Sequence, residues 1–273
     1  MSYIVNSNYT AEQVKFLESR KEFINFLFGD GVLPDSLLLI QQGKGSFEGC
    51  VGTLEMLHQQ KAEYAWFVDH DLHEFKLNCY IASRLKYIRT KYMKEEGLMW
   101  EGQYFYALLS EYEPIIQWMI EQPISASMQK RINNPAQNQY RYYQMTLALQ
   151  GNWSEIKKRA EVFLSDPPSK MKKYIPDQRF YLALANADKA GMEVALAELT
   201  HPKLALKHNG NFDFAFSGNF IGCFATLYAK IAQRYGFILD ISTPYIPAEW
   251  IPIAPLSEYL DPYDFMQKYN IVS

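Results

Sequence analysis

The sequence predicts an all-α fold of stacked α-hairpins, followed by an extended C-terminal arm that is rich in proline and aromatic residues. Apolar residues recur at the spacing of helix faces over most of the 273 residues. No segment of convincing length alternates with the period of two expected of a half-buried strand, and only residues 237–241 are strand-like. Five prolines between positions 244 and 262 exclude a long helix there, because proline lacks an N–H donor and restricts the residue before it.

Composition and charge argue against several classes of protein. The formal net charge of −3 excludes a generally basic nucleic-acid binder. Residues 1–8 contain no basic region and no apolar stretch of a secretory signal, and no apolar run approaches the roughly 20 residues that cross a bilayer. The three cysteines are widely spaced and odd in number, so a disulfide framework is not expected. Together these features predict a cytoplasmic protein without nucleic-acid or membrane partners.

The first half of the chain carries clear signals for helix starts and ends. Thr10 and Gln13 have the spacing of a capping box, in which each side chain satisfies a backbone N–H at the start of a helix. Apolar residues at helical spacing then extend to Gly29 and Gly31, which end this helix. Further helices are expected over residues 52–67, 71–96 and 103–120. Pro114 is expected to break the last of them or to start a new one.

The second half of the chain contains an internal repeat. Leu147 and Leu182 are equivalent at an offset of 35 residues, and each copy predicts a helix, a short polar turn, a second helix and a proline. A helix–turn–helix unit of this period resembles tetratricopeptide packing, in which neighbouring pairs bury each other's faces. We expect residues 133–273 to form a helical-repeat region with the C-terminal arm, continuous in one domain with an N-terminal helical region over residues 1–132.

No motif predicts catalysis, and we expect no catalytic residues, no metal and no cofactor. The run from Asp69 to Glu74 includes His70 and His73, but these two histidines are three residues apart. A pair of metal-binding histidines on one helix face is typically four residues apart. Asp71 is instead expected to cap a helix, with Glu74 as its partner in a capping box.

The C-terminal arm carries acidic residues among large aromatic ones. From position 236 onward five acidic residues oppose one lysine, whereas residues 84–94 and 157–173 are rich in lysine and arginine. Acids interleaved with tyrosines and a tryptophan suit the core and rim of an interface with a basic partner. The alternative is that the arm docks on the basic helices of its own chain, with its aromatic side chains pointing mostly inward. The residues expected to bind a partner are Tyr245, Glu249, Trp250, Glu258, Tyr259, Asp261, Tyr263 and Asp264.

Three segments of the second half are similar to those of a known family. They are DQRFYLAL from Asp177, followed by Asp188; FATLYAKIA from Phe224, leading into Gly236; and TPYIP from Thr243, with PLSEY from Pro255. In their order they resemble the immunity protein 49 family of bacterial polymorphic toxin systems. The resemblance covers roughly residues 140–269, and the region before Asn133 has no counterpart. It implies a small helical protein that binds a toxin domain delivered by neighbouring bacteria and so protects its own cell.

The leading hypothesis is therefore an immunity protein that neutralises a cognate antibacterial toxin by direct protein–protein contact, without enzymatic activity. Such inhibition needs a rigid complementary surface, and a proline-rich arm is already restricted in its free state, so little entropy is lost on docking. One alternative is a tetratricopeptide-like scaffold that binds peptides or proteins of its own cell. Another is an enzyme with a site assembled from scattered residues such as His70, His73 and Glu74. The sequence leaves the oligomeric state open.

Overall fold

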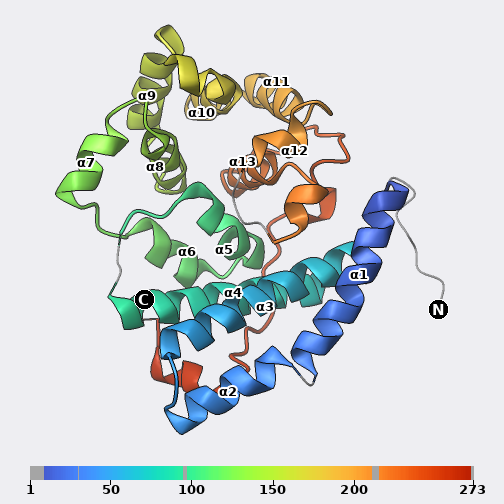
Figure 1. Ribbon diagram of the computed structural model, residues 1–273. Coiled ribbons are helices and arrows are strands. Elements are labelled where there is room, and N and C mark those ends of the chain that lie inside the picture. Colours follow the sequence, from blue (N-terminus) through green and yellow to red (C-terminus); the bar gives the residue numbers. More distant parts are fainter. Residues whose placement is uncertain (1–8, 30, 95–96, 211–214, 272–273) are drawn as a thin grey trace.

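The computed structural model describes residues 9–29, 31–94, 97–210 and 215–271. Every regular element over these residues is a helix, which confirms the expected all-α class (Figure 1). The α-helices are α1 (Ala11–Phe28), α2 (Val32–Gln42), α3 (Phe47–Phe67), α4 (Leu72–Met93), α5 (Tyr104–Ser110), α6 (Glu113–Ile120), α7 (Ala126–Ile132), α8 (Asn138–Leu149), α9 (Trp153–Ser165), α10 (Ile175–Ala185), α11 (Lys189–Leu199), α12 (Ala205–His208) and α13 (Cys223–Arg234). The 3-10 helices are η1 (Glu101–Gln103), η2 (Ser169–Tyr174), η3 (Ser217–Asn219), η4 (Ala248–Trp250) and η5 (Asp264–Lys268).

Several helices start where the capping signals of the sequence place them. Thr10 Oγ1 accepts the Gln13 N–H and Gln13 Oε1 accepts the Thr10 N–H, so the expected capping box forms at the start of α1. Asp71 caps α4 by accepting a hydrogen bond from the Glu74 N–H at 2.9 Å. Pro114 lies in the first turn of α6, where its missing N–H has no helical partner to lose, and it separates α6 from α5.

Other boundaries differ from the expectation. The helix expected from residue 52 begins at Phe47, because Ser46 caps it by accepting a hydrogen bond from the Gly49 N–H at 3.1 Å. The helix expected to reach residue 96 ends at Met93, where Lys94 adopts a left-handed conformation with φ of 55°. The strand-like residues 237–241 form no strand, since no other extended segment pairs with them in the described chain.

The long helices α3 and α4 form an antiparallel pair through the middle of the molecule (Figure 1). Helices α1 and α2 pack on α3, whereas α5 and α6 pack on α4, and α7 to α13 form an arc beyond them. One connected set of buried apolar side chains extends from Leu17 in α1 to Met266 in η5. This set includes described residues from both sides of residue 133, and a smaller separate set comprises Tyr140, Phe163, Met171 and Tyr174.

The segments that align in the sequence lie in two successive helix pairs, α8 with α9 and α10 with α11. Each second helix begins after a capped polar turn. Asn152 accepts a hydrogen bond from the Glu155 N–H in α9, and Asp188 accepts one from the Gly191 N–H in α11. Helix α9 also packs on α10, so the two pairs are in direct contact.

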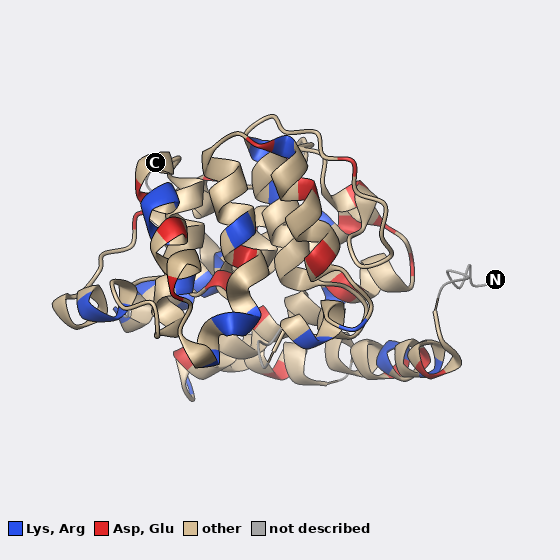
Figure 2. Ribbon diagram, turned by 90° about the horizontal axis from the view of Figure 1, so that it is seen from above, with Lys and Arg blue, Asp and Glu red and all other residues tan. Residues whose placement is uncertain are grey.

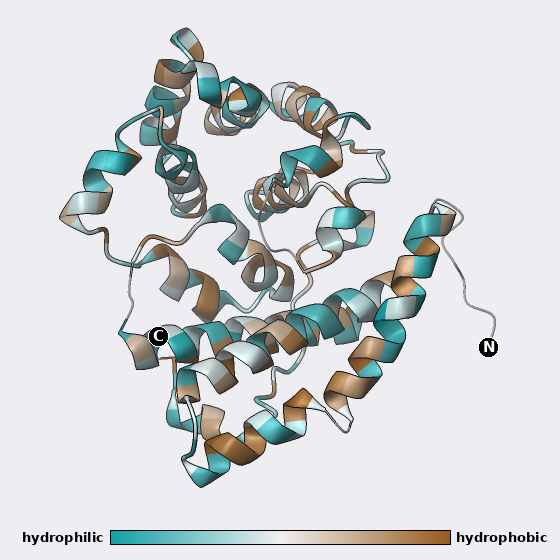
Figure 3. Ribbon diagram, in the orientation of Figure 1, coloured by the Kyte–Doolittle hydropathy of each residue, from teal (hydrophilic) through white to brown (hydrophobic). Residues whose placement is uncertain are grey.

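Helices α1 and α2 carry several exposed apolar side chains. Figure 3 shows hydrophobic positions in brown along both helices. Phe26 is 59% exposed and Leu38 is 49% exposed. By length and composition alone, residues 11–42 are sufficient to cross a membrane, contrary to the expectation that no run of this kind exists. In the structure this stretch is divided into two helices that both pack against α3.

A buried carboxyl group joins the central helices to the second half of the chain. Glu63 in α3 is fully buried and accepts a hydrogen bond from the Tyr106 hydroxyl at 2.7 Å. It also accepts the backbone N–H groups of Phe216 and Ser217. Burial raises the pKa of Glu63 from its ordinary value of 4.5 to about 8, although these hydrogen bonds oppose the shift.

A second buried polar cluster joins η1, α8, α10, α12 and α13. Arg141 Nη1 lies 2.9 Å from Glu101 Oε2 and 3.6 Å from Asp177 Oδ1. Asp177 also accepts a hydrogen bond from the Tyr228 hydroxyl at 2.6 Å and lies 3.0 Å from His208 Nε2. Burial raises the pKa of Glu101 to about 7, against the effect of Arg141. Burial would also raise the pKa of Asp177, but His208 and Arg141 outweigh it and lower this pKa.

We expect Glu63→Gln to make the stability of the protein less dependent on pH. Because folding raises the pKa of Glu63 from 4.5 to about 8, its contribution to stability is fully present below pH 4.5 and is lost as the pH rises through 8. Glutamine does not ionise and can still accept the two backbone N–H groups. Urea unfolding at pH 5 and pH 9 should show a loss in the wild-type protein, on the order of 1–4 kcal/mol, that the variant lacks. Equal losses in both proteins would contradict this assignment.

Candidate partner-binding surface

The C-terminal arm, residues 237–271, crosses the α3–α4 pair from the side of α13 to the end that lies next to α2 (Figure 1). It contains η4 and η5 and is otherwise irregular over its described residues. The prolines of the arm account for this, because each removes a backbone donor that a longer helix would need. Its place in the structure therefore depends on side-chain and backbone contacts with the helices beneath it.

Trp250 anchors the first part of the arm in the hydrophobic core. Its side chain is 1% exposed, and its ring stacks on Phe75 with centroids 4.3 Å apart and planes 13° apart. Trp66 and Phe67 contact it edge-on at 5.6 Å and 6.1 Å. Burial keeps Trp250 away from any partner in this conformation, which corrects its assignment as a partner-binding residue. The alternative, in which this side chain points inward, describes what the structure shows.

A buried ion cluster then holds the backbone of the arm. The Lys230 ammonium group contacts the Glu111 carboxylate and donates hydrogen bonds to the carbonyls of residues 250–252 at 2.7–3.3 Å. Glu111 Oε2 accepts the Ala254 N–H at 2.8 Å and a hydrogen bond from Lys76 at 3.2 Å. Lys76 also donates to the Ala254 carbonyl at 2.7 Å. The three charged side chains are at most 4% exposed, so the arm itself supplies the acceptors that two buried ammonium groups need.

Two of the expected partner-binding residues are bound to the body of the protein instead. The Asp261 carboxylate accepts hydrogen bonds from Arg84 at 2.9 Å and from the Tyr80 hydroxyl at 2.7 Å. The Tyr259 hydroxyl donates to the Ser110 carbonyl at 2.7 Å. Because Arg84 belongs to the basic run 84–94, the alternative of an acidic arm docked on its own basic helix holds at Asp261.

Tyr263 is held by a chain of hydrogen bonds with a defined direction. Asn78 uses its Nδ2 to donate to Glu74, so its Oδ1 accepts from His58 Nδ1 at 2.7 Å. His58 Nε2 is then the acceptor for the Tyr263 hydroxyl at 2.6 Å. Burial lowers the pKa of His58 to about 4, although the Asn78 hydrogen bond opposes the shift, so the imidazole is neutral above that pH.

The remaining residues of the expected set are accessible. Glu249, Glu258 and Asp264 are exposed, and within the described chain none of these carboxylates has an ion-pair partner. Tyr245 is half-buried. Tyr245 and Glu249 line a cavity of about 780 Å³ that is also bounded by Trp66. The arm thus presents these three unpaired acidic groups, and the exposed Asp240 as a fourth, on a backbone that is fixed from below.

Charge is mixed over the rest of the molecule. Basic and acidic residues are interspersed on the helices in the view of Figure 2 rather than gathered into one region. Not all basic residues of the run 157–173 are available at the surface. Arg159 is buried and donates hydrogen bonds to the Ile132 carbonyl at 2.6 Å and to the Tyr140 carbonyl at 2.9 Å. Exposed acids without an ion-pair partner in the described chain also occur outside the arm, for example Glu18, Glu121 and Glu161.

The residues around Asp71 form a helix start. Glu74 pairs with Lys61 at 2.8 Å and accepts a hydrogen bond from Asn78, while His70 occupies the turn between α3 and α4 with φ of 54°. No group of three His, Cys, Asp or Glu side chains in the part of the chain that the structure describes could hold a metal ion. Among the described residues, His70, His73 and Glu74 therefore do not form a three-residue metal site.

Sequence reasoning did not identify Lys230, Glu111 and Lys76. Lys230 follows Ala229 and precedes Ile231 in an otherwise apolar helical segment, where a lysine is rarely buried without a partner. This was a usable signal for a buried ion pair. It could not name Glu111, because the two residues are 119 positions apart.

The chain matches no protein-family model, and no curated protein or solved structure is significantly similar to it. The resemblance to the immunity protein 49 family stays a prediction, since none of these comparisons bears on it.

We expect Trp250→Ala to destabilise the protein by about 3–5 kcal/mol, because it leaves a large cavity among buried aromatic rings. Urea unfolding followed by circular dichroism measures this loss. The matched control is Leu260→Ala on the same arm, where the side chain is 60% exposed and the change should stay within about 0.5 kcal/mol. Equal effects of the two substitutions would show that the arm is not part of the cooperative core.

We expect Lys230→Met to destabilise the protein by about 3–5 kcal/mol, because it leaves buried acceptors without a donor and weakens the pairing of Glu111. Proteolysis of the arm should also become faster. Glu111→Gln combined with Lys230→Met should cost less than the sum of the two single changes, since the pair is coupled. Additive free energies of unfolding would contradict the direct contact.

Proposed function

We propose that this protein is an immunity protein, which binds and neutralises a cognate antibacterial toxin by direct protein–protein contact. The observation that carries the proposal is the exposure of Glu249, Glu258 and Asp264 without ion-pair partners in the described chain. They lie on an arm whose backbone is fixed by Trp250 and Lys230. An ordered surface loses little conformational entropy on binding, and unpaired carboxylates favour a partner with a basic surface.

Neutralisation of this kind requires no chemistry from the protein. Three separated carboxylates would speed the encounter with a basic toxin surface by electrostatic attraction, which weakens as the salt concentration rises. The half-buried ring of Tyr245 next to Glu249 offers an apolar contact of the type that anchors interfaces. Inhibition follows when the bound protein covers the active site of the toxin or the path to its substrate.

The family resemblance supports the same proposal. Its segments begin at Asp177 in α10, at Phe224 in α13 and at Thr243 and Pro255 in the arm. Two of them contact each other through the Tyr228–Asp177 hydrogen bond of 2.6 Å. The hydrogen bonds of Lys230 to the carbonyls of residues 250–252 hold the part of the arm that lies between the segments at Thr243 and Pro255.

A second candidate is a tetratricopeptide-like scaffold that binds peptides or proteins of its own cell. The packing of α9 on α10 between two helix pairs favours it, as does the exposure of Val162 in α9 and Val194 in α11, which are 50% and 68% exposed. Loss of peptide binding on changing these valines, in a protein that gives no protection against a toxin, would favour this candidate over the first.

The test replaces Glu249, Glu258 and Asp264 together with lysine. Co-expression with a candidate cognate toxin should show loss of protection, and affinity for the purified toxin should fall by roughly 10–100-fold, because each reversed charge costs about 0.5–1 kcal/mol. Thermal unfolding should be nearly unchanged, since these side chains are exposed.

The control changes three exposed acids outside the arm, Glu18, Glu121 and Glu161, to lysine, which alters the net charge by the same amount. This variant should protect as well as the wild-type protein. Full protection by the arm variant would show that these acids do not bind the toxin. Equal loss of protection in both variants would show that only the net charge of the protein matters.

A further inference from the structure

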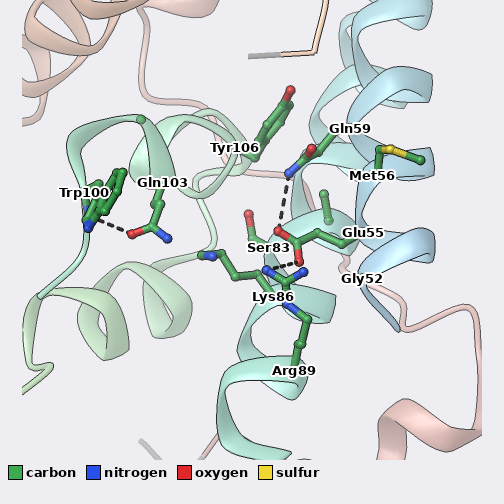
Figure 4. A pocket seen from close by; sticks show the side chains of 12 residues that line it. Gly52, Glu55, Met56, Gln59, Ser83, Lys86, Arg89, Trp100, Gln103 and Tyr106 are labelled. Atoms are coloured by element: carbon green, nitrogen blue, oxygen red, sulfur yellow. Dashed lines mark hydrogen bonds and ion pairs between the residues drawn. The ribbon is translucent and has the colours of Figure 1, made fainter. Parts of the chain in front are cut away.

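A polar cleft lies between α3, α4 and the segment that leads into α5 (Figure 4). Its first cavity has a volume of about 390 Å³. A second cavity of about 290 Å³ adjoins it and shares Lys86, Arg89, Trp100 and Gln103 with the first. Together they reach the size of sites that enclose small molecules in proteins. No residue of the C-terminal arm lines either cavity, so the cleft is separate from the proposed toxin-binding surface.

The Arg89 and Glu55 side chains form an ion pair at one side of the cleft, so their charges neutralise each other. Arg89 Nη2 lies 3.4 Å from Glu55 Oε2. Gly52 makes room for this guanidinium group, because a Cβ at that position would lie 2.8 Å from Arg89 Nη1. The other acidic residue of the cleft, Glu48, lines only the second cavity. The charge of Arg89 is therefore largely neutralised within the protein.

Lys86 lines the first cavity, and its positive charge has no ion-pair partner among the described residues. Among the residues that the structure describes, its Nζ has neither a hydrogen-bond nor an ion-pair partner. Figure 4 shows its side chain running toward Gln103 and Trp100, away from the Glu55 carboxylate. Burial lowers the pKa of Lys86, against the attraction of Glu55. An anion placed beside this ammonium group would restore the interactions that burial has removed.

Gln103 and Trp100 face the same space. Gln103 Oε1 accepts the Trp100 backbone N–H at 2.7 Å, and this fixes the amide so that its Nε2 donors point toward Lys86 (Figure 4). The Trp100 ring stacks on Tyr142, with centroids 5.6 Å apart and planes 17° apart, and is still 49% exposed. Its exposed surface lines both cavities.

We propose that this cleft binds a small aromatic anion, with its charged group between Lys86 Nζ and Gln103 Nε2 and its ring against Trp100. A carboxylate or a phosphate accepts charge-assisted hydrogen bonds from an ammonium group and an amide at the same time. A flat ring adds stacking and burial on an indole that is already held in place by Tyr142. The ligand class is therefore a free metabolite that carries an aromatic ring and one carboxylate or phosphate group.

The test is calorimetric titration of the full-length protein with two ring-bearing anions, adenosine monophosphate and 2-naphthoate. Adenosine and inorganic phosphate are the matched probes for the first anion, and 2-naphthalenemethanol and acetate are those for the second; in each pair one probe lacks the charge and the other lacks the ring. At least one ring-bearing anion should bind with a dissociation constant below about 1 mM, and at least tenfold more tightly than its matched probes. Whichever anion binds more tightly shows whether the cleft prefers a phosphate or a carboxylate group. No saturable binding of either anion up to 10 mM would overturn the proposal.

Lys86→Met keeps most of the apolar stem but removes the charge, and should weaken binding at least tenfold. Lys91→Met, an exposed change on the same helix, should leave the affinity unchanged. Trp100→Leu should weaken the binding of the ring-bearing anion but not that of inorganic phosphate. This variant also tests the same cleft if the Lys86 variant fails to fold. Undiminished binding by folded Lys86→Met or Trp100→Leu protein would overturn the proposal.

Discussion

The buried carboxylate of Glu111, held between Lys230 and Lys76, is the interaction on which the arrangement of this protein depends. It joins α13, α4 and the turn after α5, and the same two lysines hold the backbone of the arm. Charges out of water are stable only when every partner is in place, so these segments assemble together. Glu111 also adopts a left-handed conformation with φ of 60°, which a non-glycine residue keeps only where its surroundings require it. The arm is thus part of the core, although it contains no α-helix.

Two other buried polar groups connect distant parts of the chain in the same manner. Glu63 joins α3 to η3, and the salt bridge of Arg141 with Glu101 joins α8 to η1. Apolar burial drives collapse but has no direction, whereas a buried carboxyl group must meet its donors at hydrogen-bond distance. The apolar core therefore supplies most of the driving force, and these polar contacts select one relative placement of the helices.

The proposed functions follow from charges that the fold leaves without partners. Asp261 is neutralised by Arg84 at 2.9 Å, but Glu249, Glu258 and Asp264 have no ion-pair partner in the described chain. Such exposed carboxylates cost little in stability and remain available to a basic partner. In the cleft, Arg89 is likewise paired with Glu55, whereas Lys86 has no ion-pair partner in the described chain. The two surfaces have opposite unpaired charge and share no lining residue, so they can act independently.

Local interactions let the sequence alone determine the all-α class, the caps of Thr10 and Asp71 and the break at Pro114, because each involves residues within one turn of a helix. The sequence also shows acidic and aromatic residues in the arm, but it does not show which of them are accessible to solvent. Only the tertiary structure buried Trp250, paired Lys230 with a carboxylate 119 positions away and left residues 237–241 without a strand partner. The physical reason is that burial and ion pairing depend on which distant segments meet, and one-dimensional spacing carries no record of that.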